Sequence, residues 1–206
     1  MADILQHAEG GVLTLTLNRP ERKNSLTSAM YATLADALAQ AATDDATRVV
    51  VIQGNEAMFC AGNDIEEFLH QPPMGADSPV LRFLRAIATF PKPLLASVCG
   101  PAVGIGTTML FHCDLVYAGD NAAFSMPFVN LGLCVEGAAS LLAPAMFGYH
   151  RAAEALLLGD PISPRPRSRS ASSTRSCRRP KPTPTRSRSR PSWRPNRRCR
   201  SWKPSA

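Results

Sequence analysis

The stretch LLASVCGPAVGIGTTMLFHCD, residues 94–114, contains the signals that decide the fold of this chain. Its first seven residues, 94–100, are mostly apolar, which is typical of a strand buried on both faces. Gly104 and Gly106 follow, and glycine lets the backbone approach a neighbouring segment or a ligand closely. A helical pattern then covers 104–112. The stretch therefore predicts a strand, a glycine-bearing turn and a helix in succession.

The same alternation continues on both sides of this stretch. Further strands are expected at 12–18, 48–54 and 114–119, and further helices from Thr27 and at 79–90, 136–147 and 150–158. The first of these strands alternates apolar and polar residues and is expected to be half-buried, whereas the other two are expected to be buried on both faces. Strands that alternate with helices predict a layered α/β domain with parallel strands.

The charge of the chain divides it into two unlike parts. The chain has 23 Lys and Arg residues and 16 Asp and Glu residues. Fifteen of the basic residues and none of the acidic ones lie in 164–206, so the net charge is −8 for 1–163 and +15 for the tail. The tail is rich in Pro, Ser and Arg, and it cannot bury enough apolar surface to offset the entropy of ordering. We expect a folded domain at 1–163 and a disordered tail at 164–206.

Several classes of protein are not favoured. The start of the chain, MADILQHAEGG, lacks a basic segment followed by an apolar one, as a secretion signal would have. No apolar run reaches the ~18 residues that a membrane helix needs. The cysteines form no CxxC pair and no His has zinc-like spacing, so no metal site is expected. A cytoplasmic protein without membrane contact is the resulting expectation.

A second glycine-bearing turn, MFCAGNDIEEF at 58–68, follows the buried strand at 48–54. The start of a helix leaves free backbone N–H groups at its positive end, and two such turns can aim two donors at one oxygen. Such an oxyanion hole is worth about 3–4 kcal/mol per donor. On the glycines alone, two tight turns without a ligand remain an alternative. Neither turn has the spacing of a dinucleotide-binding or P-loop motif.

Five separated motifs follow one another between Val12 and Ile162: LTLNRPERKNSL, FCAGNDIEEF, CGPAVGIG, CDLVYAG and FSMPFVNLGLCVEGAASLLAP. In their order and spacing they resemble the enoyl-CoA hydratase/isomerase (crotonase) superfamily. The resemblance implies a crotonase-like α/β fold with a ββα spiral core, and an acyl-CoA substrate of fatty-acid β-oxidation. It implies no separate cofactor, because CoA is part of the substrate. Family members form homotrimers or hexamers through C-terminal helices, which the basic tail replaces here.

The resemblance also implies which residues bind the substrate. The two oxyanion donors would be the backbone N–H groups of Asn63 and Ile105, with Gly104 forming the turn before the second. The positions that match the CoA-binding segments of the family are Arg22, Lys23, Ser25, Ala61, Asp64 and Ile65. Arg22 and Lys23 are two of only eight basic residues in the acidic domain, which suits an anionic ligand.

The carboxylates separate the possible reactions. Hydratases of the family use two glutamates, and the matching positions here hold Thr108 and Phe128. Glu136 instead occupies the place of the single catalytic glutamate of the Δ3,Δ2-enoyl-CoA isomerase branch. A single base is sufficient to move a double bond, and it acts best if an apolar pocket raises its pKa. Phe128, Leu133 and Met126 are expected to form that pocket.

Alternatives remain at this stage. Glu136 could be a glutamate in the first turn of a helix, favoured there by the helix dipole. A 2-enoyl-CoA hydratase would need a second base that the sequence does not identify. A non-catalytic CoA-fold module could use the basic tail to bind nucleic acid, although Trp193 and Trp202 are its only aromatic residues for stacking. The composition and abrupt start of the tail also fit a shifted reading frame in GC-rich DNA.

Overall fold

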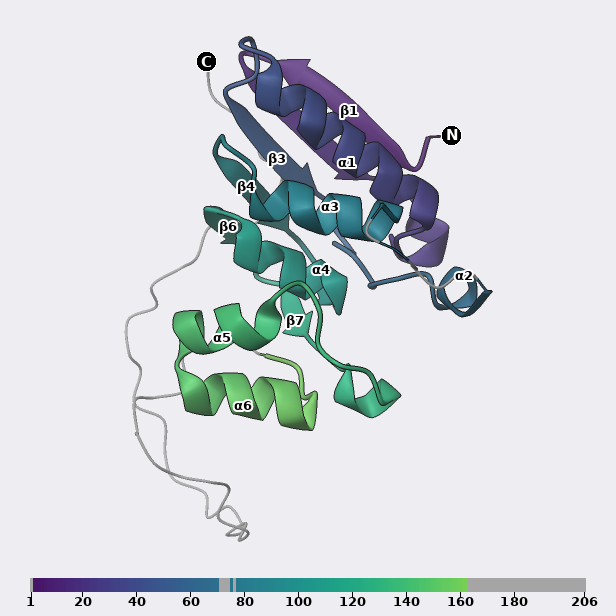
Figure 1. Ribbon diagram of the computed structural model, residues 1–206, viewed down its shortest axis with the longest axis vertical. Coiled ribbons are helices and arrows are strands. Elements are labelled where there is room, and N and C mark those ends of the chain that lie inside the picture. Colours follow the sequence, from purple (N-terminus) through teal and green to yellow (C-terminus); the bar gives the residue numbers. More distant parts are fainter. Residues whose placement is uncertain (1, 71–74, 76, 163–206) are drawn as a thin grey trace, which may run out of the picture.

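The computed structural model describes residues 2–70, 75 and 77–162, and the basic tail therefore lies outside the described residues. The described residues form a main sheet with the strand order β1-β2-β3-β4-β6 (Figure 1). These strands are Ile4–Glu9, Val12–Leu17, Val49–Gln53, Leu94–Val98 and Leu115–Ala118. β1 and β2 form an antiparallel hairpin, and the remaining neighbours pair in parallel. The predicted parallel α/β arrangement is confirmed.

A second, smaller sheet lies next to the main one. It pairs β5 (Pro101–Val103) with β7 (Ala123–Ser125) in parallel. β5 begins three residues after the end of β4, with Cys99 and Gly100 between them. Gly100 has a positive φ, and a Cβ there would lie only 2.0 Å from the carbonyl oxygen of Ala57. Only glycine fits this corner, which turns the chain from one sheet into the other.

Helices cover the main sheet and extend beyond it. α1 (Ser28–Thr43) and α3 (Pro79–Ala88) lie next to each other over one face, while α5 (Ala139–Phe147) and α6 (Tyr149–Leu158) lie side by side at the far end (Figure 1). Thr27 caps α1 by accepting a hydrogen bond from the N–H of Met30, and the helix therefore begins where the sequence predicted it. The short helix α2 (Ile65–His70) follows the first glycine turn.

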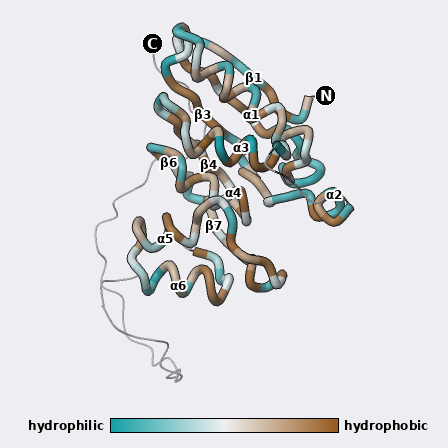
Figure 2. Tube along the Cα trace, viewed as in Figure 1, coloured by the Kyte–Doolittle hydropathy of each residue, from teal (hydrophilic) through white to brown (hydrophobic). Residues whose placement is uncertain are grey.

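The core lies between α1, α3 and the sheet. Its fully buried members include Tyr31, Leu34 and Leu38 of α1, with Phe83 of α3 and Ile52 of β3. In Figure 2 the tube along β3 is mostly coloured as hydrophobic. The consecutive residues Val50, Val51 and Ile52 of β3 are all buried, so the centre of the run at 48–54 is buried on both faces, as predicted. Among the described residues, no helix is long and apolar enough to cross a membrane.

Some boundaries and burial patterns differ from the prediction. The helix expected at 136–147 begins only at Ala139, and the helix expected at 104–112 divides into α4 (Ile105–Thr108) and a 3-10 helix (Met109–His112). The strand at 114–119 forms as β6, but each of its residues is exposed. The reason is its place at the edge of the sheet, where β4 is its one partner among the described strands. Two further 3-10 helices are Pro20–Arg22 and Val129–Leu131.

A buried asparagine fastens the loop after β2 to the first glycine turn. The side-chain nitrogen of Asn24 donates to the carbonyl oxygens of Met58 and Phe59, each at 3.1 Å. Its side-chain oxygen accepts the N–H of Arg19 at 2.9 Å. Asn24 is fully buried and has a left-handed backbone with φ of 54°. Both its side chain and its backbone conformation therefore contribute to holding this loop in place.

Asn24→Ala should lower the free energy of unfolding by about 3 kcal/mol. The substitution leaves buried backbone groups without partners and places alanine in the left-handed region. Urea denaturation of the full chain measures the loss. The matched control is Asn121→Ala, because the Asn121 side chain also donates to a carbonyl, that of Glu56, but on the exposed surface. The control should lose no more than about 0.5 kcal/mol. Equal losses in the two variants would contradict the role given to Asn24.

Candidate active site

The two glycine turns lie side by side. Cys60 of the first turn forms a parallel bridge with Ala102 of β5, and the N–H of Val103 donates to the Cys60 carbonyl at 2.8 Å. A Cβ placed on Gly62 would lie 3.1 Å from the carbonyl oxygen of Val103, and one on Gly104 would lie 3.9 Å from the Cα of Gly62. The absence of side chains at Gly62 and Gly104 therefore lets the ends of the two turns meet.

The N–H groups of Asn63 and Ile105 are both available at these ends. The carbonyl of Gly62 accepts the N–H of Leu26 at 2.8 Å. Because the N–H of Asn63 belongs to the same trans peptide unit, it points away from Leu26. Ile105 is the first residue of α4, a position whose N–H has no partner within the helix. Among the described residues, neither N–H donates to a protein acceptor.

Glu136 lies beside α4. It precedes α5 by two residues, Gly137 and Ala138, which both have a left-handed backbone. The hydroxyl of Thr108, the last residue of α4, donates to Oε1 of Glu136 at 3.4 Å. A Cβ on Gly137 would lie 3.1 Å from that hydroxyl, so glycine lets the segment approach Thr108. The same helix thus begins with the free N–H of Ile105 and ends with the partner of Glu136.

Burial raises the pKa of Glu136 to about 7, and the hydrogen bond from Thr108 opposes the rise. The dipole alternative for this residue is wrong, because the first turn of α5 contains no acidic residue. Two of the three residues expected to shield the site, Met126 and Phe128, are buried. The ring of Phe128 lies close to the second turn, because its Cζ is 3.9 Å from the position that a Cβ on Gly104 would occupy. The third expectation is wrong: Leu133 is 46% exposed, since it lies in the open loop before α5.

The residues expected to bind CoA fall into two groups. Asp64 is engaged within the protein: it accepts from Arg19 at 2.6 Å, and the pKa of its carboxyl is lowered chiefly by that hydrogen bond. Arg19 also donates to the backbone and hydroxyl oxygens of Ser25. Together these bonds tie the loop after β2 to the first glycine turn. Arg19 was not identified from the sequence as a member of this cluster.

The second group is accessible to a ligand. Arg22, Lys23 and Ile65 are exposed, and Ile65 retains 61% of its surface although it is apolar. Ala61 is half-buried and donates its N–H to the carbonyl of Lys23 at 3.0 Å. Arg22 is joined to Glu66 by an exposed ion pair of 3.7 Å. The structure thus places positive charge and apolar surface on the two segments named from the sequence.

Tyr31 is a member of the site that the sequence did not reveal. Its hydroxyl donates to the side-chain oxygen of Asn63. Burial raises its pKa well above the ordinary value, and the nearby Glu136 carboxylate adds to the rise. Tyr31 therefore lies within electrostatic reach of Glu136 as well as in contact with Asn63. In the sequence it occupies one of the apolar positions of α1 and gives no separate signal.

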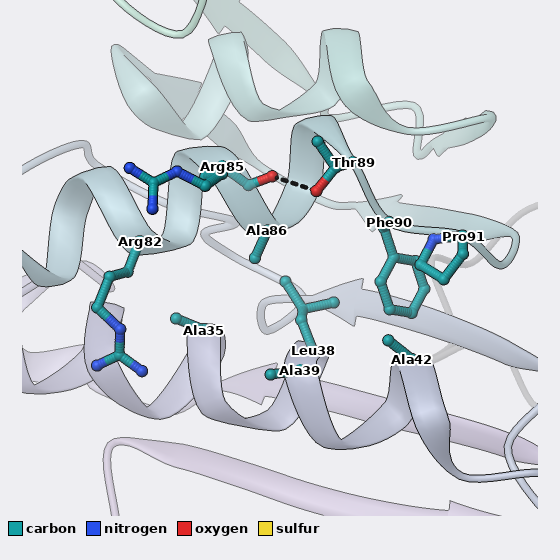
Figure 3. Close-up of a pocket in the computed structure, with 10 residues that line it drawn as sticks. All are labelled: Ala35, Leu38, Ala39, Ala42, Arg82, Arg85, Ala86, Thr89, Phe90 and Pro91. Carbon is teal, nitrogen blue, oxygen red and sulfur yellow. Dashed lines mark hydrogen bonds between the residues drawn. The ribbon is translucent and has the colours of Figure 1, made fainter. Parts of the chain in front are cut away.

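A groove between α1 and α3 lies outside this site. Its volume is about 300 Å³, and it is lined mainly by small and apolar side chains, with Arg82 and Arg85 at one end (Figure 3). Neither Glu136 nor the two turns contribute to its lining. The groove therefore offers no part of the chemistry described here.

The fold, the paired turns and the half-buried Glu136 beside them define a crotonase-like α/β domain, which confirms the predicted fold class. Residues 7–169 match the family model "Enoyl-CoA hydratase/isomerase", and the chain belongs to that family.

Individual relatives agree with this assignment. The chain is 41% identical over 168 residues to the rat protein named enoyl-CoA delta isomerase 2, covering 79% of this chain and 43% of that protein. It is 40% identical to 1,2-epoxyphenylacetyl-CoA isomerase of Escherichia coli, covering 79% and 65%. The solved structure of OdaA from Pseudomonas aeruginosa has 55% sequence identity and a TM-score of 0.77, covering 79% and 66%. The chain thus spans less than two thirds of each of these proteins.

Glu136 should titrate near pH 7 in the folded protein, and Thr108→Val should move its midpoint upward by about 0.5–1 pH unit. The hydroxyl of Thr108 stabilises the ionised carboxylate, so its removal favours the protonated form. Carbon-13 NMR of labelled glutamate carboxyls measures the midpoint, and Glu136→Gln identifies the signal by deleting it. Thr89→Val, an exposed substitution at the end of α3, serves as the control. A lower midpoint in Thr108→Val would contradict this arrangement.

Proposed function

We propose that the protein moves the double bond of a 3-enoyl-CoA to the 2-position, with Glu136 as the single base. The observation that carries the proposal is the contact between Glu136 and Thr108, at the place where a hydratase would have one of its two glutamates. Thr108 connects Glu136 to the α4 turn that presents Ile105, and Tyr31 connects it to the turn that presents Asn63. A hydrogen bond therefore links the candidate base to the helix that presents one donor, and Tyr31, which bonds to the residue that presents the other donor, lies within electrostatic reach of Glu136.

The reaction follows from these groups. The Glu136 carboxylate removes a proton from C2 of the substrate, and the electrons of the C–H bond move into a dienolate. The negative charge on the thioester oxygen is stabilised by the N–H groups of Asn63 and Ile105. The protonated Glu136 then returns the proton at C4, which completes the shift without water. With its pKa raised to about 7, the carboxyl is half ionised at neutral pH and is a stronger base than an ordinary glutamate.

The nucleotide end of CoA would lie against the loop after β2. Arg22 and Lys23 are exposed there, and their positive charge suits the phosphates of CoA. Ser25, Ala61, Asp64, Ile65 and Gly104 would shape the path of the pantetheine arm. Of these, Ser25 and Asp64 act through the Arg19 cluster that holds the two segments together.

Hydration of a 2-enoyl-CoA is the second candidate, because the family description includes both reactions. It requires one group to activate water and another to protonate the substrate. Thr108 and Phe128 occupy the positions where a hydratase would have its two glutamates, and neither side chain can act as a base at neutral pH. The nucleic-acid-binding alternative concerns the tail, which lies outside the described residues. The cytoplasmic location and the homotrimer or hexamer stay predictions.

Glu136→Gln should reduce the isomerisation rate at least ~100-fold, since glutamine cannot accept the proton. Absorbance of the conjugated 2-enoyl thioester follows the reaction from a 3-enoyl-CoA substrate. Glu9→Gln, at an exposed site on β1, should retain the wild-type rate. Hydration of a 2-enoyl-CoA is measured in parallel. Hydration that persists in Glu136→Gln would favour the second candidate, and a wild-type protein without either activity would reject both.

Lys23→Glu should raise KM for a CoA thioester about 5–10-fold and leave kcat nearly unchanged. The substitution reverses a charge that is expected to face the phosphates, and added salt should reduce the difference. The same acyl group on N-acetylcysteamine is the control, because this thioester lacks every phosphate. An equal rise in KM for both thioesters would show that Lys23 does not act on the nucleotide.

A further inference from the structure

The hydrogen bond from Tyr31 to Asn63 has no role in the reaction steps proposed above. Its side chain rises from the first turn of α1 and is 1% exposed. The ring packs against that of Phe83 of α3, with the ring centroids 5.5 Å apart. A tyrosine that is enclosed in this way has a fixed position, and its hydroxyl reaches out of the core to the side-chain oxygen of Asn63.

The peptide unit between Gly62 and Asn63 carries one of the two proposed oxyanion donors. On its carbonyl side, the oxygen of Gly62 accepts the N–H of Leu26. On its other side, the Asn63 side chain accepts the hydroxyl of Tyr31. Gly62 itself has φ of 101° and no side chain, so it provides little restraint of its own. The backbone on both sides of Asn63 is bridged to Leu26, which donates to the Gly62 carbonyl and accepts the N–H of Asp64, and the bond from Tyr31 adds a restraint through the Asn63 side chain.

Tyr31 is unsuited to transferring a proton in this reaction. Burial is the main cause of its raised pKa, and the charge of the Glu136 carboxylate raises it further. The phenol thus stays neutral over the pH range in which Glu136 titrates. A neutral hydroxyl that donates to Asn63 can orient that residue at every pH at which the enzyme would work.

We propose that Tyr31 is a positioning residue, whose hydroxyl holds the Asn63 side chain and thereby aims the Asn63 N–H at the thioester oxygen. This inference rests on the proposed function, because the aimed donor matters only where an enolate forms. Preorganised donors contribute most when they are aligned before charge develops, and small misplacements are costly. The hydroxyl of Tyr31 therefore acts on the reaction through Asn63 and does not need to touch the substrate.

Tyr31→Phe tests the proposal, because it removes the hydroxyl and keeps the ring that packs against Phe83. We expect kcat for the isomerisation to fall about 10-fold, with KM changed less than about 2-fold. The midpoint of the pH–rate profile should stay where the wild-type protein has it, since Glu136 keeps its partner Thr108. Asn63→Ala removes the same bond from the turn side without touching the core, and it should reduce kcat by a similar factor.

The double variant Tyr31→Phe/Asn63→Ala decides whether the hydroxyl acts through Asn63. If it does, the double variant is no slower than Asn63→Ala alone. A double variant whose loss of kcat equals the product of the two single losses would overturn the proposal. A Tyr31→Phe variant with the wild-type kcat would also overturn it. A loss of kcat that comes with a displaced pH–rate midpoint would also overturn it, because the hydroxyl would then be acting on Glu136.

A second measurement separates this inference from the proposed function. Acetoacetyl-CoA forms a stable enolate whose near-ultraviolet absorbance reports stabilisation by the two N–H donors without turnover. The bound wild-type protein should show a larger enolate fraction than Tyr31→Phe at the same pH. Equal fractions would overturn the inference even if isomerisation occurs. If the wild-type protein binds the enolate but moves no double bond, the proposed reaction is wrong. The absorbance measurement then still tests the positioning role of Tyr31.

Discussion

The pairing of the first glycine turn with β5 is the constraint on which the site depends. Phe59 and Cys60 both donate their N–H groups to the carbonyl of Pro101, and Val103 donates back to Cys60. The approach is close enough that a Cβ on Gly106 would lie 2.7 Å from the Cys60 carbonyl. Because these contacts are backbone to backbone, they hold two amide groups in register, and they require glycine where the two segments approach most closely. Donors held in this way need no reorganisation when charge develops on a bound oxygen.

Burial of Glu136 gives the site its second property. Removing the carboxylate from water raises its pKa, and the Thr108 hydroxyl limits the rise so that the midpoint lies near neutrality. The water-poor surroundings that make the carboxyl a stronger base also strengthen the attraction between an oxyanion and the neighbouring N–H groups. A segment with two left-handed residues, folded against α4, thus places the proposed base beside the helix whose first N–H is a proposed donor.

Two ion pairs in the loop after β2 show why a motif alone does not assign a role. Arg19 and Asp64 are 16% and 11% exposed and share further hydrogen bonds with Ser25, so their pair holds the loop against the glycine turn. Arg22 and Glu66 are 57% and 72% exposed, and a pair of that kind contributes at most about 1 kcal/mol. Arg22 can therefore exchange its partner for an anionic ligand. The two motifs assigned both Asp64 and Arg22 to CoA binding, but the burial of Asp64 gives it a structural role and the exposure of Arg22 leaves it accessible to a ligand.

The sequence by itself determined the features that depend on local pattern. An alternating pattern and three apolar runs predicted the four parallel strands, and glycines marked both turns. The tertiary structure decided whatever depends on contacts between distant segments. β5 and β7 contain three residues each, too few to show a period, and they form because they pair with each other. The start of α5, the partner of Asp64 and the bond from Tyr31 to Asn63 likewise arise from packing, since these residues are adjacent only in the folded chain.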